Sequence, residues 1–354
     1  MAKFYFLCSL MAVLLLGELS AQDARFSQFY ANPQFTNPAL TGVMEGQMRF
    51  NANYRELYTS VLGNNGFKTI AAGLDFRRPV GKGNFFGIGI NLMRDEVGES
   101  NFTRNQALVS GSYQKQLGGS RRGRGPAHFL VAGGQLGFGQ RGFDVEKLWF
   151  SRQFFVDPTS RAAYVDQGLS SGEAFLASSS GLYLDFNAGL LWYAVFDENT
   201  SFYAGASAAH LNEPNISPRE EVDILPRRYS VQLGGEFPLG SSGFSVLPAL
   251  IAQSQGPLFS GMAGANIRYT QREWREVALR AGAWVHVSNR LDQTSTDAII
   301  ISSILEMDRW QLGLSYDLST GDITDSNFGR GAFEVSMIYT QPANYRSRVV
   351  CPKF

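Results

Sequence analysis

The residues most capable of chemistry are three histidines, His128, His210 and His286. They lie in separate segments and lack the cysteine or carboxylate spacing of a zinc or di-metal site, so we expect no metal. His286 and Ser288 would share one face of a strand, where they could meet as base and nucleophile. Such pairs arise often by chance, and we therefore expect no enzymatic activity. No glycine-rich phosphate loop precedes a helix, so we expect no cofactor.

Charge gives little support for an anionic partner. The 354 residues include 31 basic and 31 acidic side chains, so nucleic acid is not an expected partner. One basic run, Arg121-Arg122-Gly123-Arg124, could bind phosphate. On a turn between strands it could equally contact lipid headgroups, a periplasmic partner or water.

The first 21 residues have the pattern of a secretory signal peptide. Lys3 supplies the positive charge, residues 4–16 the apolar run and residues 19–21 the cleavage end. The run is shorter than the roughly 20 apolar residues of a membrane span. Cleavage there would start the mature chain at Gln22 and leave Cys351 as its one cysteine. One cysteine cannot form an internal disulfide, which excludes a disulfide-stapled scaffold.

The elements that must position any site are strands. In residues 228–237, RYSVQLGGEF, apolar and aromatic side chains alternate strictly with polar residues and glycine. This is the period of a strand with two unlike faces. In a soluble sandwich the polar face would meet water, whereas in an outer-membrane barrel the apolar face meets lipid and the polar face lines the lumen.

The pattern recurs in about 14 segments, each near the length of a tilted spanning strand. The register of residues 299–304 stays open because both faces are apolar. The expected strands are 46–55, 67–77, 84–95, 103–117, 127–141, 181–196, 201–211, 227–238, 243–254, 258–271, 275–287, 296–305, 309–318 and 332–341. Charged residues expected on the polar face are Asp75, Asp185, Arg228, Glu236, Glu276, Arg280 and Asp317.

The connections between the expected strands differ in length according to whether they are even- or odd-numbered along the chain. Even-numbered ones are mostly tight, and odd-numbered ones, such as 56–66, 142–181, 212–226, 288–295 and 319–331, are mostly long. The brief break at residues 255–257 and the longer turn at 118–126 are exceptions. Outer-membrane barrels have short periplasmic turns and longer external loops. The sequence therefore predicts an all-β transmembrane antiparallel barrel with an irregular N-terminal segment.

The long connection 142–181 is rich in aromatic residues for a solvated loop. It could be a lid folded into the barrel mouth or a protein-binding surface, and both interpretations stay open. Its candidate partner-binding residues are Trp149, Phe150, Phe154, Phe155 and Tyr164.

Both ends of the mature chain carry motifs. Near the start stand Phe26-Ser27-Gln28-Phe29-Tyr30, Asn32-Pro33, Asn37-Pro38-Ala39 and Thr41-Gly42, and the chain closes with Cys351-Pro352-Lys353-Phe354. These motifs resemble those of PorP/SprF-type outer-membrane proteins of the type IX secretion and gliding motility apparatus. Arg25 stands where glutamine is commoner in this pattern.

The resemblance implies an accessory outer-membrane barrel that supports export and surface anchoring of an adhesin through its C-terminal domain. It also implies two kinds of partner, a secreted surface protein with that domain and a periplasmic, peptidoglycan-linked lipoprotein or secretion component. A passive channel for solutes or hydrophobic compounds is the alternative, because inward charges also suit a porin.

A barrel of about 14 strands has a lumen too wide for ordinary side chains to fill. We therefore expect residues 22–45 to plug the lumen or cover its periplasmic mouth. The expected division is a signal peptide at 1–21, this segment, a barrel at 46–342 and a tail at 343–354. The terminal Phe354 would suit recognition by the barrel-insertion machinery.

Overall fold

The computed structural model describes most of the chain. The described residues are 23–81, 83–119, 126–166, 168–170, 172, 179–197, 199–217, 222–240, 242–270, 277–290, 293–320, 330–343 and 351–352. The expected signal peptide, the basic run 121–124, Glu276 and Phe354 lie outside this set.

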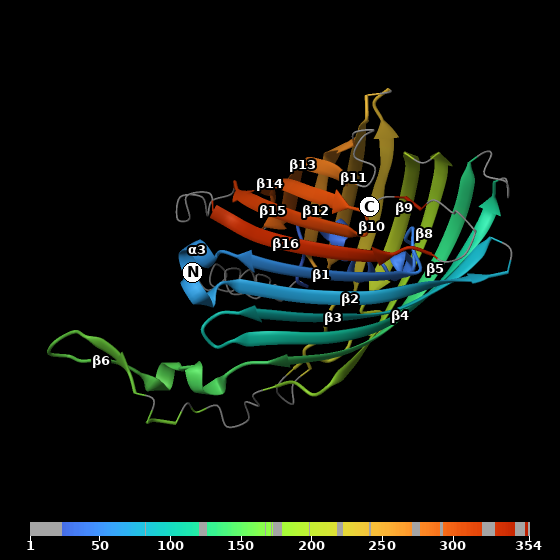
Figure 1. Ribbon diagram of the computed structural model, residues 1–354. Helices are drawn as coiled ribbons and strands as arrows, with labels where there is room; N and C mark the ends of the chain where they lie inside the picture. Colours follow the sequence, from blue (N-terminus) through green and yellow to red (C-terminus); the bar gives the residue numbers. More distant parts are fainter. Residues whose placement is uncertain are drawn as a thin grey trace, which may run out of the picture.

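Fourteen strands close into one antiparallel barrel, in which each strand pairs with the next barrel strand along the chain, β5 with β8 among them, and β1 pairs with β16 (Figure 1). Separate from the barrel, β6 (Phe154–Val156) and β7 (Ala163–Val165) form a two-stranded hairpin. The barrel strands are β1 (Met48–Leu57), β2 (Phe67–Val80), β3 (Asn84–Val97), β4 (Phe102–Gly118), β5 (Ala127–Gly142), β8 (Tyr183–Asp197), β9 (Thr200–Ala209), β10 (Arg228–Pro238), β11 (Phe244–Gln255), β12 (Leu258–Thr270), β13 (Val277–Arg290), β14 (Gln293–Met307), β15 (Trp310–Ser319) and β16 (Arg330–Gln341).

The alternating strands place apolar side chains on the outside of the barrel and polar side chains in the lumen, as the sequence predicts. Along β10, Tyr229, Val231 and Leu233 are exposed on the outside, whereas Ser230 and Gln232 are buried in the lumen. The isoleucines of residues 299–304 follow the same rule, with Ile300 and Ile304 inside and Ile301 outside. An apolar outer surface and a polar interior are the inverse of a soluble protein and suit a barrel set in lipid.

The two ends of the barrel differ. β1 begins and β16 ends at the end with the tight connections, which by the rule for outer-membrane barrels is periplasmic. The prediction of a long external connection at 288–295 is wrong, because β13 continues to Arg290 and β14 starts at Gln293. Extending both strands pairs their backbone groups, which a loop would leave to water.

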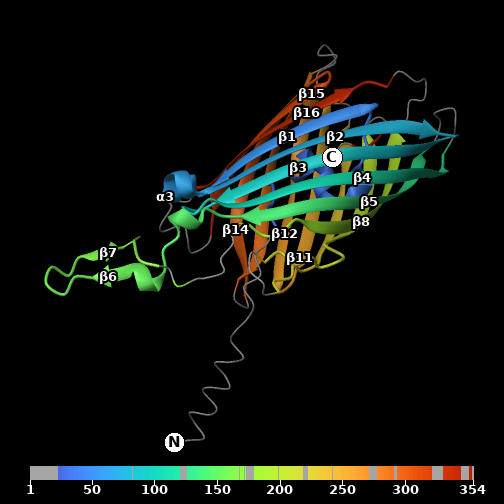
Figure 2. The ribbon, with the colours of Figure 1, turned by 90° about the horizontal axis from the view of Figure 1, so that it is seen from below.

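Short helices occupy the N-terminal segment and some connections. They are η1 (Phe29–Ala31), α2 (Pro33–Thr36), η2 (Pro38–Leu40), α3 (Thr59–Leu62), η3 (Gly63–Asn65), η4 (Val145–Lys147) and η5 (Ser151–Gln153). Within the described part of the chain, every helix is too short or too polar to cross a membrane. Seen from below, α3 and the β6–β7 hairpin lie at the same end of the barrel (Figure 2).

Candidate functional site

Residues 23–45 run inside the barrel and are mostly buried. The two Asn-Pro pairs start helical turns, with Pro33 first in α2 and Pro38 first in η2. Proline suits this position because its fixed φ is already helical and the missing N–H would have no helical partner. The side chain of Asn37 caps η2 by accepting a hydrogen bond from the Ala39 N–H at 2.9 Å. The irregular segment is thus a compact chain of turns that fits within the lumen.

The segment is bonded across the seam where β1 meets β16. The backbone N–H of Ser27 donates to Glu334 of β16 at 2.7 Å, and its hydroxyl donates to Asp317 of β15 at 2.8 Å. Arg55 of β1 pairs with the same two carboxylates, at 2.7 Å to Asp317 and 3.1 Å to Glu334. Gln28 adds a backbone bond to Glu334 at 3.1 Å. All these groups are buried, so segment and seam share one ionic cluster.

A second cluster fixes the segment near the periplasmic end. Asp75 of β2 accepts a hydrogen bond from the Gly42 N–H at 2.6 Å and pairs with Arg49 of β1 at 2.7 Å. Arg49 also donates to the carbonyls of Leu40 and Val43, at 3.0 and 3.1 Å. The predicted inward charge at Asp75 therefore binds the chain's own N-terminal segment.

A third cluster lies near the external end, around Asp23. Its carboxylate contacts Arg104, lies 2.8 Å from Arg228 and lies 2.7 Å from Nε2 of His210. Burial alone would raise the pKa of Asp23, but these positive neighbours hold that pKa well below its usual value. Burial works against the charged form of His210, yet Asp23 and Asp185 raise its pKa above the usual value. This cluster ties residue 23 directly to β4 and β10, and to β8 through His210 and Asp185.

Aromatic rings and a glycine of the barrel wall also pack closely against residues 23–45. Phe29 packs edge-on against Trp284 of β13 at 5.6 Å between ring centroids, and Tyr30 contacts the same ring at 5.9 Å. On the opposite wall, Gly133 of β5 faces the backbone of Pro38 and Ala39 so closely that no Cβ would fit. Glycine on the lumen face thus gives room to the N-terminal segment.

The inward charges predicted from alternation are confirmed among the described residues. Asp75, Asp185, Arg228, Glu236, Arg280 and Asp317 are all buried on the lumen side. Several of them bind residues 23–45, a role that the sequence pattern alone does not reveal. A clue lies in the N-terminal motif, whose Ser, Gln and Asn residues bring polar groups to a buried segment.

The C-terminal signature lies beside the end of this segment. Cys351 is buried, with its sulfur 3.2 Å from the Met44 carbonyl oxygen and 3.1 Å from Nη1 of Arg77. Burial raises the pKa of the Cys351 thiol, so the group stays neutral at ordinary pH. Cys351 therefore joins the tail to both the N-terminal segment and β2.

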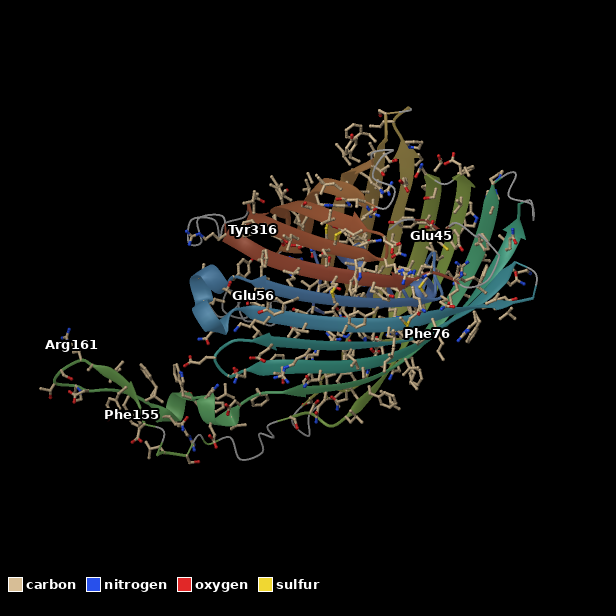
Figure 3. The ribbon with its side chains drawn as sticks, viewed as in Figure 1. Glu45, Glu56, Phe76, Phe155, Arg161 and Tyr316 are labelled. Carbon is tan, nitrogen blue, oxygen red and sulfur yellow. The ribbon has the colours of Figure 1, made fainter. Side chains whose placement is uncertain are left out.

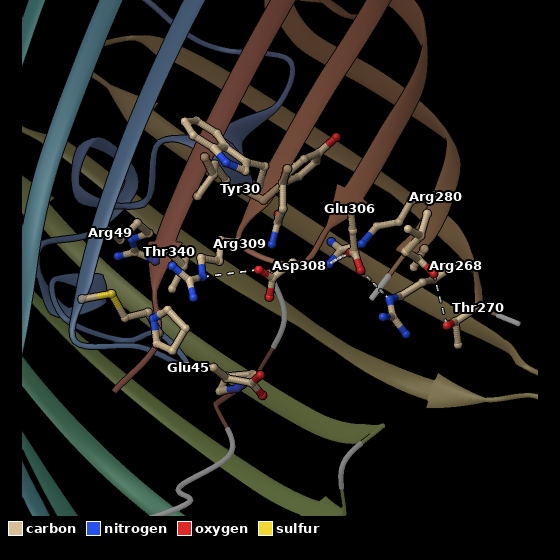
Figure 4. Close-up of a pocket in the computed structure, with 18 of the residues that line it drawn as sticks. Tyr30, Glu45, Arg49, Arg268, Thr270, Arg280, Glu306, Asp308, Arg309 and Thr340 are labelled. Carbon is tan, nitrogen blue, oxygen red and sulfur yellow. Dashed lines mark hydrogen bonds and ion pairs between the residues drawn. The ribbon is translucent and has the colours of Figure 1, made fainter. Parts of the chain in front are cut away.

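A cavity of about 420 Å³ remains near the periplasmic end, beneath Tyr30. Arg268 of β12 and Arg280 of β13 converge on Glu306 of β14 along its wall (Figure 4). Pro352 of the tail lines the same cavity. The space is polar, bordered by charges of both signs, and large enough for a few side chains of another polypeptide.

The external connection after β5 extends as an arm that ends in the β6–β7 hairpin. Trp149 stacks on Phe154 at 5.7 Å and Phe155 stacks on Tyr164 at 5.8 Å. These four rings are nevertheless at least one-third exposed. Figure 3 shows Phe155 and Arg161 well away from the barrel wall. This placement does not match a lid folded into the barrel mouth.

The histidines do not gather into one site. His128 stacks on Trp192 at 6.0 Å, and His210 belongs to the Asp23 cluster. His286 does approach a serine, but Nε2 lies 2.9 Å from Oγ of Ser260 on β12 rather than bonding to the predicted Ser288. The reason is that antiparallel pairing brings side chains of adjacent strands together. Among the described residues, no three His, Cys, Asp or Glu side chains form a metal-binding group.

Fold and site together define an outer-membrane β-barrel whose lumen contains its own N-terminal segment. The family model described as type IX secretion system membrane protein PorP/SprF matches residues 18–339. The chain therefore belongs to the PorP/SprF family of type IX secretion membrane proteins, and it is an outer-membrane protein. The family expected from the terminal motifs is thus confirmed.

Solved barrels share the fold at low identity. A deletion mutant of the monoaromatic hydrocarbon channel TodX is 11% identical, with a TM-score of 0.50 over 88% of this chain and 94% of that one. The hydrocarbon channel CymD is 11% identical, with a TM-score of 0.46 over 89% and 94%. The toluene transporter TodX of Pseudomonas putida is 13% identical, with a TM-score of 0.44 over 90% and 95%. No curated protein sequence matches the chain significantly.

Proposed function

We propose that this protein is an accessory barrel that supports export and cell-surface anchoring of an adhesin-type protein through its C-terminal domain. The observation that carries the proposal is the bonding of residues 23–45 to the lumen wall at three levels, around Asp23, Ser27 and Gly42. A barrel filled in this way serves better as a rigid membrane-embedded support than as a conduit. On this proposal residues 22–45 are a lumen plug.

The two ends of the barrel suit two partners. Externally, the arm presents Trp149, Phe154, Phe155 and Tyr164 in two exposed stacks, and aromatic residues are enriched in protein interface cores. We assign this surface to the secreted cargo, together with the neighbouring Phe150. At the periplasmic end, the cavity beside Pro352 would receive a lipoprotein or secretion component. The terminal Phe354 would act earlier, as part of the barrel-insertion signal.

A passive channel is the second candidate. The cavity of about 420 Å³ favours it, because part of the lumen is empty. The fold shared with hydrocarbon channels is compatible with this function but does not establish it, since one fold hosts many functions. Against a channel stands the plug, whose displacement would leave the carboxylates of Asp317 and Glu334 without their Ser27 bonds.

The test is affinity purification of the tagged barrel from native outer membranes. We expect a surface protein with a type IX C-terminal domain to co-purify with the wild type. Replacing Trp149 and Phe155 by Ala should reduce its recovery about tenfold or more, because interface aromatics often contribute over 1 kcal/mol each. Val222→Ala, at another exposed external position, is the matched control and should leave recovery unchanged. Recovery of the barrel alone, with no type IX cargo, would contradict the proposal.

A further inference from the structure

Three lumen-facing side chains on neighbouring strands form a serine–histidine–carboxylate series. Oγ of Ser260 on β12 lies 2.9 Å from Nε2 of His286 on β13. The other ring nitrogen, Nδ1, lies 3.1 Å from Oδ2 of Asp297 on β14, as an ion-pair contact without the alignment of a hydrogen bond. His286 and Asp297 are buried, and all three residues lie near the external ends of their strands. A nucleophile, a base and an orienting carboxylate in this order are the parts of an activated serine.

A β-bulge aims the carboxylate at the histidine. His286 pairs with Ala298 and Val287 pairs with Thr296, so Asp297 is the extra residue opposite β13. Ile299 and Ile301 face lipid, and strict alternation would turn Asp297 outward as well. The bulge brings it into the lumen instead, where the residue is only 8% exposed. Bulges redirect side chains in this manner and are frequent next to active sites.

A fourth residue, Arg25, determines which ring nitrogen of His286 carries the proton. Nη1 of Arg25, from the N-terminal segment, lies 2.7 Å from Nε2 of His286. Arginine can only donate hydrogen bonds, so Nε2 must accept and the ring proton must be on Nδ1, facing Asp297. This is the tautomer that a general base requires. Arg25 also occupies the lone pair that would take the Ser260 proton, which keeps the serine inactive.

We propose that Ser260, His286 and Asp297 form a latent acyl-transfer site that Arg25 gates. When Arg25 withdraws, the Ser260 proton moves to Nε2 of His286 while Oγ bonds to the carbonyl carbon of an ester. The carbon–oxygen bond to the alcohol then breaks, and the alcohol leaves with the proton from His286. Water repeats the sequence on the acyl-serine, releasing a carboxylic acid and restoring Ser260.

The surroundings define the substrate class. The adjoining cavity measures only about 30 Å³ and is lined by Phe26, Phe35 and Met262. That volume holds about one water molecule, so no acyl group enters while Arg25 is in place. The Arg25 side chain is 33% exposed and lies 4.0 Å from Oδ2 of Asp297, so on this proposal it withdraws by giving up its contacts with His286 and Asp297. The site would therefore take a small ester with an apolar acyl group, arriving from the external end.

The test is labelling of the folded, purified barrel with a fluorophosphonate probe, which loses fluoride as a serine oxygen bonds to its phosphorus. We expect Arg25→Ala to be labelled faster than the wild type, with mass spectrometry placing the label on Ser260. Arg25→Gln, which keeps an amide donor, is the second gate variant. Adding His286→Asn to the Arg25→Ala background should slow labelling about 100-fold or more.

Ser288→Ala in the Arg25→Ala background is the matched control, because Ser288 lies opposite Ser260 on the same lumen face. Its labelling should equal that of Arg25→Ala. Absence of label on both folded Arg25 variants, or label on a serine other than Ser260, would overturn the proposal. Neither result bears on cargo co-purification, so this site and the anchoring function are tested separately.

Discussion

At the scale of single residues, Arg55 is the cation of a buried ionic cluster. It is buried with two buried carboxylates, Asp317 and Glu334, on the other side of the seam. Removing one member of a buried ionic group leaves the remaining charges without compensation, which costs far more than the pair contributes when intact.

Arg55→Met should therefore lower the free energy of unfolding by about 3–5 kcal/mol. Denaturant titration of the refolded barrel, followed by tryptophan fluorescence, measures this change. The control is Arg94→Met, which removes an exposed ion pair with Glu96 and should cost less than about 1 kcal/mol. Equal effects of the two substitutions would contradict the role given to the seam cluster.

The Asp23 cluster predicts a stability maximum in pH. The pKa of Asp23 is lowered, so its contribution is present above the unfolded value of about 3.9 and is lost as pH falls through the lower folded value. The pKa of His210 is raised, so its contribution is present below about 6.5 and is lost as pH rises through the higher folded value. Stability should therefore be highest in the mildly acidic range.

Unfolding free energies measured from pH 3 to pH 9 test this expectation. His210→Gln should remove the decline on the alkaline side and keep the decline on the acid side. If the alkaline decline persists in His210→Gln at full size, another group is responsible for it.

At the scale of elements, two adjacent glycines of β5, Gly133 and Gly134, lie on opposite faces of the strand and have different surroundings. A Cβ on Gly133 would meet the backbone of Pro38 and Ala39, whereas a Cβ on the next residue, Gly134, has only the Asn187 carbonyl oxygen at 4.0 Å. Gly133→Ala should destabilise the barrel by about 1–3 kcal/mol through overpacking. Gly134→Ala should stay within about 0.5 kcal/mol of the wild type. The two variants are compared by the temperature at which each loses its folded-state migration in SDS gels. Identical temperatures for the two variants would contradict the close contact between Gly133 and the N-terminal segment.

The elements also show what the sequence could predict. Alternation defines the strands because one side meets lipid and the other the lumen, and β10 follows it from Arg228 to Gly234, after which Gly235 is buried instead of exposed. It cannot foresee that Asp297 turns inward, because a bulge breaks the period. Nor can it pair Ser260 with His286, since contacts across strands depend on register rather than on spacing along one strand.

At the scale of the whole molecule, strand number and loop parity predict a barrel too wide to be filled by its own wall. The aromatic N-terminal motif indicates a buried segment, but its path through the lumen depends on partners from distant strands. Gln28, for example, bonds to Ser315 and Ser336, which lie 287 and 308 residues further along the chain. Such long-range contacts leave no local signal in the chain.

The most direct test of the account is the ionic conductance of the purified barrel in planar lipid bilayers. The wild type should show no steady open-pore current if residues 23–45, which contact the lumen wall at three levels, act as the proposed plug. A variant that lacks residues 23–42 should either conduct, as expected for an emptied barrel of this width, or fail to assemble. Steady conductance by the intact wild type, or a folded deletion variant that stays closed, would contradict the account and favour a different role for the segment.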